Sequence, residues 1–120
     1  MQLTINDKTV NLYFGVGFVR ELDKRCGLET QGLKLGMALT GKIPALFGGD
    51  VAALADILFA ATITEKNRPT QKEVDNYIDN VENLEPLFEQ VLDELEQSNG
   101  GKKLVKQMKE NLVEQANNQN

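Results

Sequence analysis

The chain has 120 residues, enough for one domain with a single modest core, and its apolar content of 41% is ordinary. One cysteine, Cys26, and no histidine rule out an intramolecular disulfide and the usual thiolate and imidazole metal sites; a reducing compartment fits this composition. We expect no secretory signal, because no basic segment precedes an apolar one at the N-terminus. The most apolar stretch, residues 51–63, is shorter than the roughly 20 residues of a membrane-spanning helix, so we expect a soluble protein.

The net charge of −5 is unevenly distributed along the chain. Residues 1–68 are close to neutral, with eight Lys and Arg against seven Asp and Glu, and residues 100–120 carry four lysines against two glutamates. Between them, residues 69–99 hold Lys72 against nine acidic side chains. Affinity for nucleic acids comes largely from Lys and Arg that neutralise phosphates. The acidic middle of the chain therefore argues against direct binding of DNA or RNA.

Residues 2–14 alternate between apolar and polar side chains, the pattern of strands with one buried face. The apolar positions are Leu3, Ile5, Val10, Leu12 and Phe14. Asn6-Asp7-Lys8 separates the two runs, and Asn and Asp tolerate the positive φ angles of a tight turn. The segment predicts a β-hairpin that the following helices must cover, because a lone two-stranded hairpin is only marginally stable.

The stretch LYFGVGFVRELDKR, residues 12–25, is typical of two different structures. A strand, glycines and a helix in this order begin a phosphate-binding loop, but they also connect a plain hairpin to a helix. A dinucleotide fingerprint needs a third glycine and a second parallel strand, and both are missing from the pattern. The P-loop pattern fails as well, because no Ser or Thr follows Gly41-Lys42. We therefore interpret Gly15 and Gly17 as residues that let the chain turn sharply off the hairpin.

The first predicted helix spans residues 16–26 and stops at Gly27, a residue suited to a left-handed C-cap. Cys26 falls on the apolar face of this helix. We interpret it as a small buried hydrophobe, since no histidine is present to activate it as a nucleophile.

The middle of the chain is rich in glycine. A weak helix is expected near residues 32–39, where Gly32 and Gly36 each cost about 1 kcal/mol relative to Ala. Residues 40–50, TGKIPALFGGD, predict a loop because they contain Pro44 and three glycines.

Four more helices follow. Asp50 is placed to cap an apolar helix at residues 51–63. TQKE at residues 70–73 is a Thr-x-x-Glu capping box that opens the next helix. Residues 84–95 show the clearest helical spacing of apolar positions, and a last amphipathic helix covers residues 104–113.

The sequence thus predicts a mostly α fold with a small β element (α+β), in which an N-terminal β-hairpin precedes five or six helices. We expect one domain over residues 1–120. It divides into the hairpin (1–14), a helical body (16–99) and a terminal helix with a frayed tail (100–120), which Gly100-Gly101 links as a hinge.

The acidic side chains of residues 73–96 lie opposite the apolar positions of their helices, which is typical of a solvated face. The alternative is a recognition surface for a basic partner. The sequence contains no calcium-loop pattern, no activated nucleophile and no cofactor motif. We therefore expect a protein that is not an enzyme and that uses no cofactor or metal.

Two features suit protein binding. The predicted loop carries apolar side chains among its glycines, and its alternative is that Leu46 and Phe47 fold back onto the core. The terminal helix can swing out on its glycines to dock elsewhere, or it simply packs as the last helix. The candidate partner-binding residues are Ile43, Leu46, Phe47, Met108 and Leu112.

Residues 1–25, MQLTINDKTVNLYFGVGFVRELDKR, are followed by a Gly-rich helical middle and an acidic helical second half. This layout resembles the tail assembly chaperones of long-tailed phages and prophages of Gram-positive bacteria. The similarity is best over residues 1–30, through the hairpin, the aromatic-Gly-x-Gly-Phe turn and Arg20-Glu21-Leu22-Asp23. None of these motifs is catalytic.

The resemblance implies a non-enzymatic role in building a phage tail. Such a chaperone coats the long apolar tape measure protein and keeps it soluble until subunits of the tail tube (major tail) protein replace it. Many copies per tape measure protein imply self-association, as a ring or spiral. The implied location is the host bacterial cytoplasm, with no membrane partner and no place in the mature virion.

Two alternatives belong to other classes: a small structural head–tail connector or completion protein of the virion, and a prophage-encoded regulator that binds another protein. The resemblance further implies a second, longer product made by a −1 ribosomal frameshift. Gly100-Gly101-Lys102-Lys103 fits a slippery codon run, and the nucleotide sequence of the gene tests this hypothesis.

Overall fold

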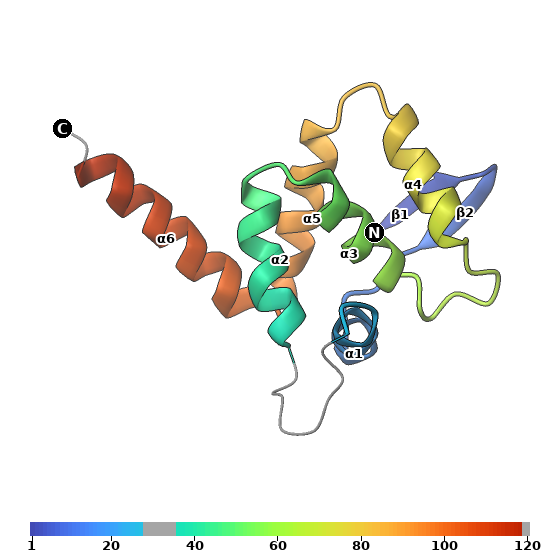
Figure 1. Ribbon diagram of the computed structural model, residues 1–120, viewed down its shortest axis with the longest axis horizontal. Coiled ribbons are helices and arrows are strands. Elements are labelled where there is room, and N and C mark those ends of the chain that lie inside the picture. The colour runs from blue at the N-terminus through green and yellow to red at the C-terminus, as the bar shows by residue number, and fades with distance from the viewer. Residues whose placement is uncertain (28–35, 119–120) are drawn as a thin grey trace.

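The computed structural model describes residues 1–27 and 36–118, in which an antiparallel two-stranded hairpin precedes six helices (Figure 1). The elements are β1 (Gln2–Ile5), β2 (Lys8–Asn11), α1 (Val16–Arg25), α2 (Met37–Phe47), α3 (Val51–Ala60), α4 (Gln71–Asn80), α5 (Glu85–Gln97) and α6 (Lys102–Asn118). The prediction of a mostly α fold with a small β element is confirmed. No helix within these residues is both long and apolar enough to cross a membrane.

The hairpin has the turn that its sequence predicts. Asn6 and Asp7 have φ angles of 51° and 63°, which a two-residue hairpin turn of this hand requires. The register pairs Ile5 with Lys8 and Leu3 with Val10. Helices cover the apolar face as expected, because α4 contacts β1 and the side chains of Ile5, Val10 and Leu12 are buried. The backbone N–H of Tyr13 also donates to the carbonyl of Ala61 at 3.0 Å.

The chain passes directly from the hairpin into α1, but Gly15 and Gly17 do not provide the sharp turn that was predicted for them. Gly15 is extended, with φ −95° and ψ −164°, and Gly17 lies inside α1, so neither needs a conformation reserved for glycine. Gly15 instead leaves room for a neighbouring ring, because a Cβ atom there would lie 2.5 Å from Cε1 of Tyr13. At the other end of α1, Gly27 has φ +70°, which confirms the predicted left-handed C-cap.

The prediction of a loop at residues 40–50 is wrong, because most of this segment belongs to α2. Proline in a helix interior costs about 3 kcal/mol and glycine about 1 kcal/mol. Against this, α2 buries three large side chains, each worth about 1.5–3 kcal/mol. They are Leu39, Ile43 and Leu46. Burial therefore outweighs the helix-breaking residues Gly41 and Pro44. Of the weak helix expected at residues 32–39, positions 32–35 lie outside the described residues, and Gly36 is the N-cap of α2.

A buried carboxylate from another helix also supports α2. Asp23 of α1 accepts hydrogen bonds from the backbone N–H groups of Gly36 at 2.8 Å and Ala38 at 3.0 Å. These donors have no partner inside the helix because they lie in its first turn. Asp23 therefore caps α2 from outside the segment and ties α1 to it.

Local capping signals are confirmed in the following helices. Asp50 accepts from the N–H groups of Ala52 and Ala53 at the start of α3, although α3 ends at Ala60 rather than at residue 63. In α4, the capping box forms in full: the Glu73 N–H donates to Thr70 Oγ1 at 3.1 Å, and the Thr70 N–H donates to Glu73 Oε1 at 3.0 Å.

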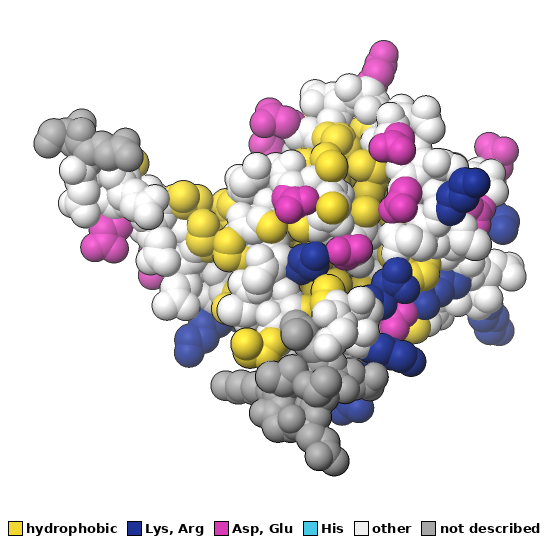
Figure 2. Space-filling view, in the orientation of Figure 1, with side chains coloured by type: hydrophobic (Ala, Val, Ile, Leu, Met, Phe, Trp, Pro, Cys, Tyr) yellow, Lys and Arg dark blue, Asp and Glu magenta, His cyan; other side chains and the backbone are white. Residues whose placement is uncertain are grey.

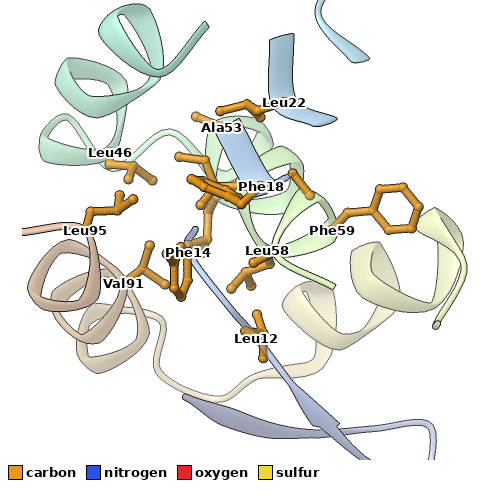
Figure 3. Close-up of a cluster of buried hydrophobic side chains, with 14 of the residues drawn as sticks. Leu12, Phe14, Phe18, Leu22, Leu46, Ala53, Leu58, Phe59, Val91 and Leu95 are labelled. Atoms are coloured by element: carbon orange, nitrogen blue, oxygen red, sulfur yellow. The ribbon is translucent and has the colours of Figure 1, made fainter. Parts of the chain in front are cut away.

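The core lies between the hairpin and the helices and draws side chains from both strands and all six helices. Figure 3 shows part of it, with labelled side chains from α1, α2, α3 and α5. The aromatic pair of the core, Phe14 and Phe18, packs edge to face with 5.1 Å between ring centroids. Phe59 is directed away from this pair (Figure 3) and is covered by two guanidinium groups, those of Arg25 at 4.2 Å and Arg68 at 3.9 Å from its ring centroid. Cys26, predicted to be buried, is half-buried against the core.

Candidate partner-binding surface

The turn between α5 and α6 is tightly packed. Gly101 is buried, and a Cβ atom there would lie 2.6 Å from the carbonyl oxygen of Leu95. Its N–H donates to Ser98 Oγ at 3.0 Å, and its carbonyl accepts from the N–H of Val105 at 2.9 Å as the first bond of α6. A Cβ atom on Gly100 would meet Cγ2 of Val19 at 3.0 Å. Both glycines therefore have a packing role, and the predicted hinge at this site stays a prediction.

From this turn, α6 projects away from the body of the molecule (Figure 1). It has 17 residues, yet Val105 is its one buried side chain. Leu104 and Met108 are half-buried against the core, and every residue from Lys109 to Asn118 is exposed. No side chain in this second half of the helix is buried, so packing against the core does little to hold it.

An apolar stripe runs along α6 past the point where its packing ends. Leu104, Met108 and Leu112 are spaced by four residues and so lie on one face of the helix. The first two are half-buried, whereas Leu112 is 40% exposed. Hydrophobic side chains gather on the side of α6 that faces α2 (Figure 2).

The helices beside this stripe add half-buried apolar side chains of their own. The helices α2, α5 and α6 contact one another pairwise. We call six of the large apolar side chains of these helices that remain partly accessible the three-helix face; they are Phe47, Phe88, Leu92, Leu104, Met108 and Leu112.

The structure places the predicted binding residues in two different environments. Ile43 and Leu46 are core residues, 1% and 2% exposed, so the alternative that Leu46 folds onto the core is confirmed. Phe47 and Met108 are half-buried on the three-helix face, and Leu112 is its exposed end.

Sequence reasoning missed the contribution of α5 to this face. Phe88 and Leu92 are among the apolar positions of the helix predicted at residues 84–95, yet they remain half-buried. Helical spacing could have shown this. Leu87, Val91 and Leu95 form the buried centre of the stripe, and Phe88 and Leu92 lie at its edge.

Charges on α5 and α6 meet near the tight turn. Lys109 Nζ donates to Glu96 Oε1 at 2.8 Å, and this hydrogen bond raises the pKa of Lys109 above its usual value. Glu85, Glu89 and Asp93 of α5 are exposed, whereas Glu94 is half-buried and lies 4.0 Å from the N-terminal amine of Met1. Within residues 1–27 and 36–118, no group of three His, Cys, Asp or Glu side chains is placed to hold a metal ion.

The chain is thus a small helical protein with a projecting helix. Its three-helix face is suited to contact with other proteins. The sequence model of a known family, described as phage tail assembly chaperone protein (TAC), matches residues 2–110. The chain therefore belongs to the phage tail assembly chaperone family, which confirms the resemblance. No curated protein and no solved structure matches the chain.

Proposed function

We propose that this chaperone coats the tape measure protein of its phage, keeps it soluble in the host bacterial cytoplasm, and helps to recruit subunits of the tail tube (major tail) protein. In this role the protein binds its partners and catalyses no reaction. The tape measure protein is the partner that the three-helix face contacts.

One observation carries this proposal: the apolar stripe of α6 continues beyond the body of the protein to Leu112. The body of the protein covers the first half of this stripe and leaves the second half open. The open half can pack against the apolar side of a helix from another chain. Recognition of an amphipathic helix by an apolar groove uses anchors at this spacing. The half-buried side chains of α2 and α5 add area beside it.

The charge of the protein suits the same role. With a net charge of −5, a chaperone bound in many copies gives the complex a repulsive acidic coat. Binding by each copy can then be weak, because many adjacent copies on one long partner act together.

Coexpression with the tape measure protein of the same phage tests the proposal. We expect the tape measure protein to be soluble with the wild-type chaperone and to copurify with it. Leu112→Ser removes an exposed anchor and should weaken binding of a labelled tape measure fragment by about tenfold or more, the effect of losing one buried leucine. Val51→Ser is the matched control, because Val51 is 50% exposed on α3 and lines a hollow between α1, α3 and α4.

Equal binding by Leu112→Ser, Val51→Ser and the wild type would show that the three-helix face is not the contact. An insoluble tape measure protein in the presence of the wild-type chaperone would contradict the proposed function itself.

A further inference from the structure

Two large side chains at the start of α1 face solvent, although the residues next to them are buried. Tyr13 is 64% exposed and Val16 is 63% exposed. The turn at residues 13–18 thus directs the aromatic pair Phe14 and Phe18 into the core and this second pair outward. Neighbouring exposed side chains of this size are a more informative feature than a single one, because they mark a surface for contact with another molecule.

The ring of Tyr13 lies over the backbone of Gly15. A Cβ atom at position 15 would lie 2.5 Å from Cε1 of Tyr13. Gly15 has φ −95° and ψ −164°, a conformation open to other residues, so the glycine makes room for the ring and is not needed for the backbone. An exposed ring with a defined position suits an interface anchor, because it has less conformational freedom to lose on binding. Tyrosine is enriched among such anchors.

Tyr13 and Val16 line a hollow of about 470 Å³. Buried core side chains such as Val19 and the turn after α5, at residues 97–100, complete the lining. A hollow of this size with apolar side chains in its lining can accept an apolar side chain from another protein. None of the lining residues belongs to the three-helix face, and the free end of α6 points away from α1 (Figure 1).

Beyond the hollow, the exposed side of α1 becomes basic. Arg20 and Lys24 follow Val16 at intervals of four residues, so all three lie along one side of the helix, and all three are exposed. At 1.5 Å per residue they span about 12 Å. Within residues 1–27 and 36–118, neither Arg20 nor Lys24 forms an ion pair. We call Tyr13, Val16, Arg20 and Lys24 the α1 face.

We propose that the α1 face docks an acidic amphipathic helix of another protein. An apolar side chain of that helix enters the hollow beside Tyr13 and Val16. Asp or Glu side chains one and two turns along the same helix meet Arg20 and Lys24. The proposal goes beyond tape measure binding by the three-helix face, because it concerns a separate surface.

The charges around the α1 face favour an acidic partner. The two acidic residues of α1 are engaged elsewhere, because Glu21 pairs with Arg68 at 2.6 Å and Asp23 caps α2. Glu94 lines the hollow, but it lies 4.0 Å from the N-terminal amine of Met1, which offsets its charge. The acidic groups of the partner are therefore expected over α1 and its apolar group in the hollow. The acidic side chains of residues 69–99 disfavour the same helix at the α4 and α5 surfaces.

Photo-crosslinking in bacteria that produce the phage tests the proposal. p-Benzoylphenylalanine in place of Tyr13 keeps an aromatic ring at this position and captures the segment that covers it. Mass spectrometry of the crosslinked peptide then identifies the segment. We expect a helical segment of another protein that carries an apolar residue and Asp or Glu side chains about four and eight positions from it.

Charge reversal on α1 tests the second part of the contact. Arg20→Glu combined with Lys24→Glu should lower the yield of this crosslink by about tenfold or more, because like charges then face each other. The matched control is Lys72→Glu combined with Lys106→Glu, which changes the net charge equally at exposed lysines of α4 and α6. This control should leave the yield unchanged. Circular dichroism on heating checks folding, and Arg20→Gln with Lys24→Gln replaces the first pair if that pair does not fold.

Several results would overturn the proposal. They are the absence of a crosslink from position 13 and the capture of a basic segment, of nucleic acid or of another copy of this chain. An equal loss from both charge-reversed pairs would also overturn it. Leu112→Ser should weaken binding of a tape measure fragment and leave the crosslink from position 13 unchanged, which separates this proposal from the proposed function. A crosslink lost in Leu112→Ser would show that the α1 face does not bind by itself and would overturn the proposal.

Discussion

A single carbon atom added at Gly101 would meet the backbone of another turn. Gly101 is buried, and the atom that a Cβ would approach at 2.6 Å belongs to the backbone of Leu95, which cannot turn aside as a side chain can. The sequence suggested a hinge because two adjacent glycines usually loosen a chain. Here the packing requires one of them to be small.

Gly101→Ala should lower the free energy of unfolding by about 1–3 kcal/mol, the usual cost of overpacking. Gly41→Ala is its control, since a Cβ atom there meets nothing within 4 Å and Gly41 lies inside α2. That change should stabilise by about 0.5–1 kcal/mol through helix propensity. Urea unfolding measures both. Equal effects of the two substitutions would show that the turn has room to adjust.

Among the elements, α2 depends most on the rest of the molecule. Its own sequence contains Gly41 and Pro44, and the side chain that caps it belongs to α1. Its stability therefore comes from buried side chains and from Asp23 and not from local propensity.

Asp23→Ala removes the acceptor for two backbone N–H groups and should cost about 1–3 kcal/mol in urea unfolding. Asp23→Asn keeps one carbonyl oxygen and should cost less. Asp50→Ala removes an exposed cap from α3 and is expected to cost about 1 kcal/mol. A cost for Asp23→Ala below that of Asp50→Ala would mean that water replaces the carboxylate.

The two halves of α6 should differ in local stability. Residues 102–108 include the buried Val105, whereas residues 109–118 are exposed and form a segment too short to be a stable helix alone. Hydrogen exchange of the free protein should therefore be much faster at the amides of residues 113–118 than at those of α5. Binding of a tape measure fragment to the three-helix face should slow exchange in the second half of α6. Uniform protection along α6 in the dilute free chain would contradict this view.

As a whole, the molecule is a flat body with extents of 49 × 41 × 21 Å, from which α6 projects (Figure 1). A protein that coats another during assembly and is then replaced should leave no copy behind. Mass spectrometry of purified phage particles should find the tape measure and tail tube proteins but no peptides of this chain. Its presence in stoichiometric amounts would instead favour the connector or completion protein considered from the sequence.

The sequence by itself determined the elements whose signals are local. The alternation of residues 2–14 with Asn6-Asp7 specifies the hairpin, Thr70 and Glu73 begin α4, and the spacing of leucines and valines gives α5. In each case the interacting groups lie within a few residues of one another, so the chain carries the whole signal. The candidate residue Leu112 was found for the same reason, as a member of a helical stripe.

Tertiary structure decided the rest. It made a helix of residues 37–47 because the cap comes from Asp23 and the driving force comes from burial of Ile43 and Leu46 in a core built by other elements. It gave Gly101 a packing role through the carbonyl of Leu95. It left the end of α6 uncovered because the body of the protein stops short of it. These outcomes depend on which segments meet in space, and periodicity along a single segment carries no information about its neighbours.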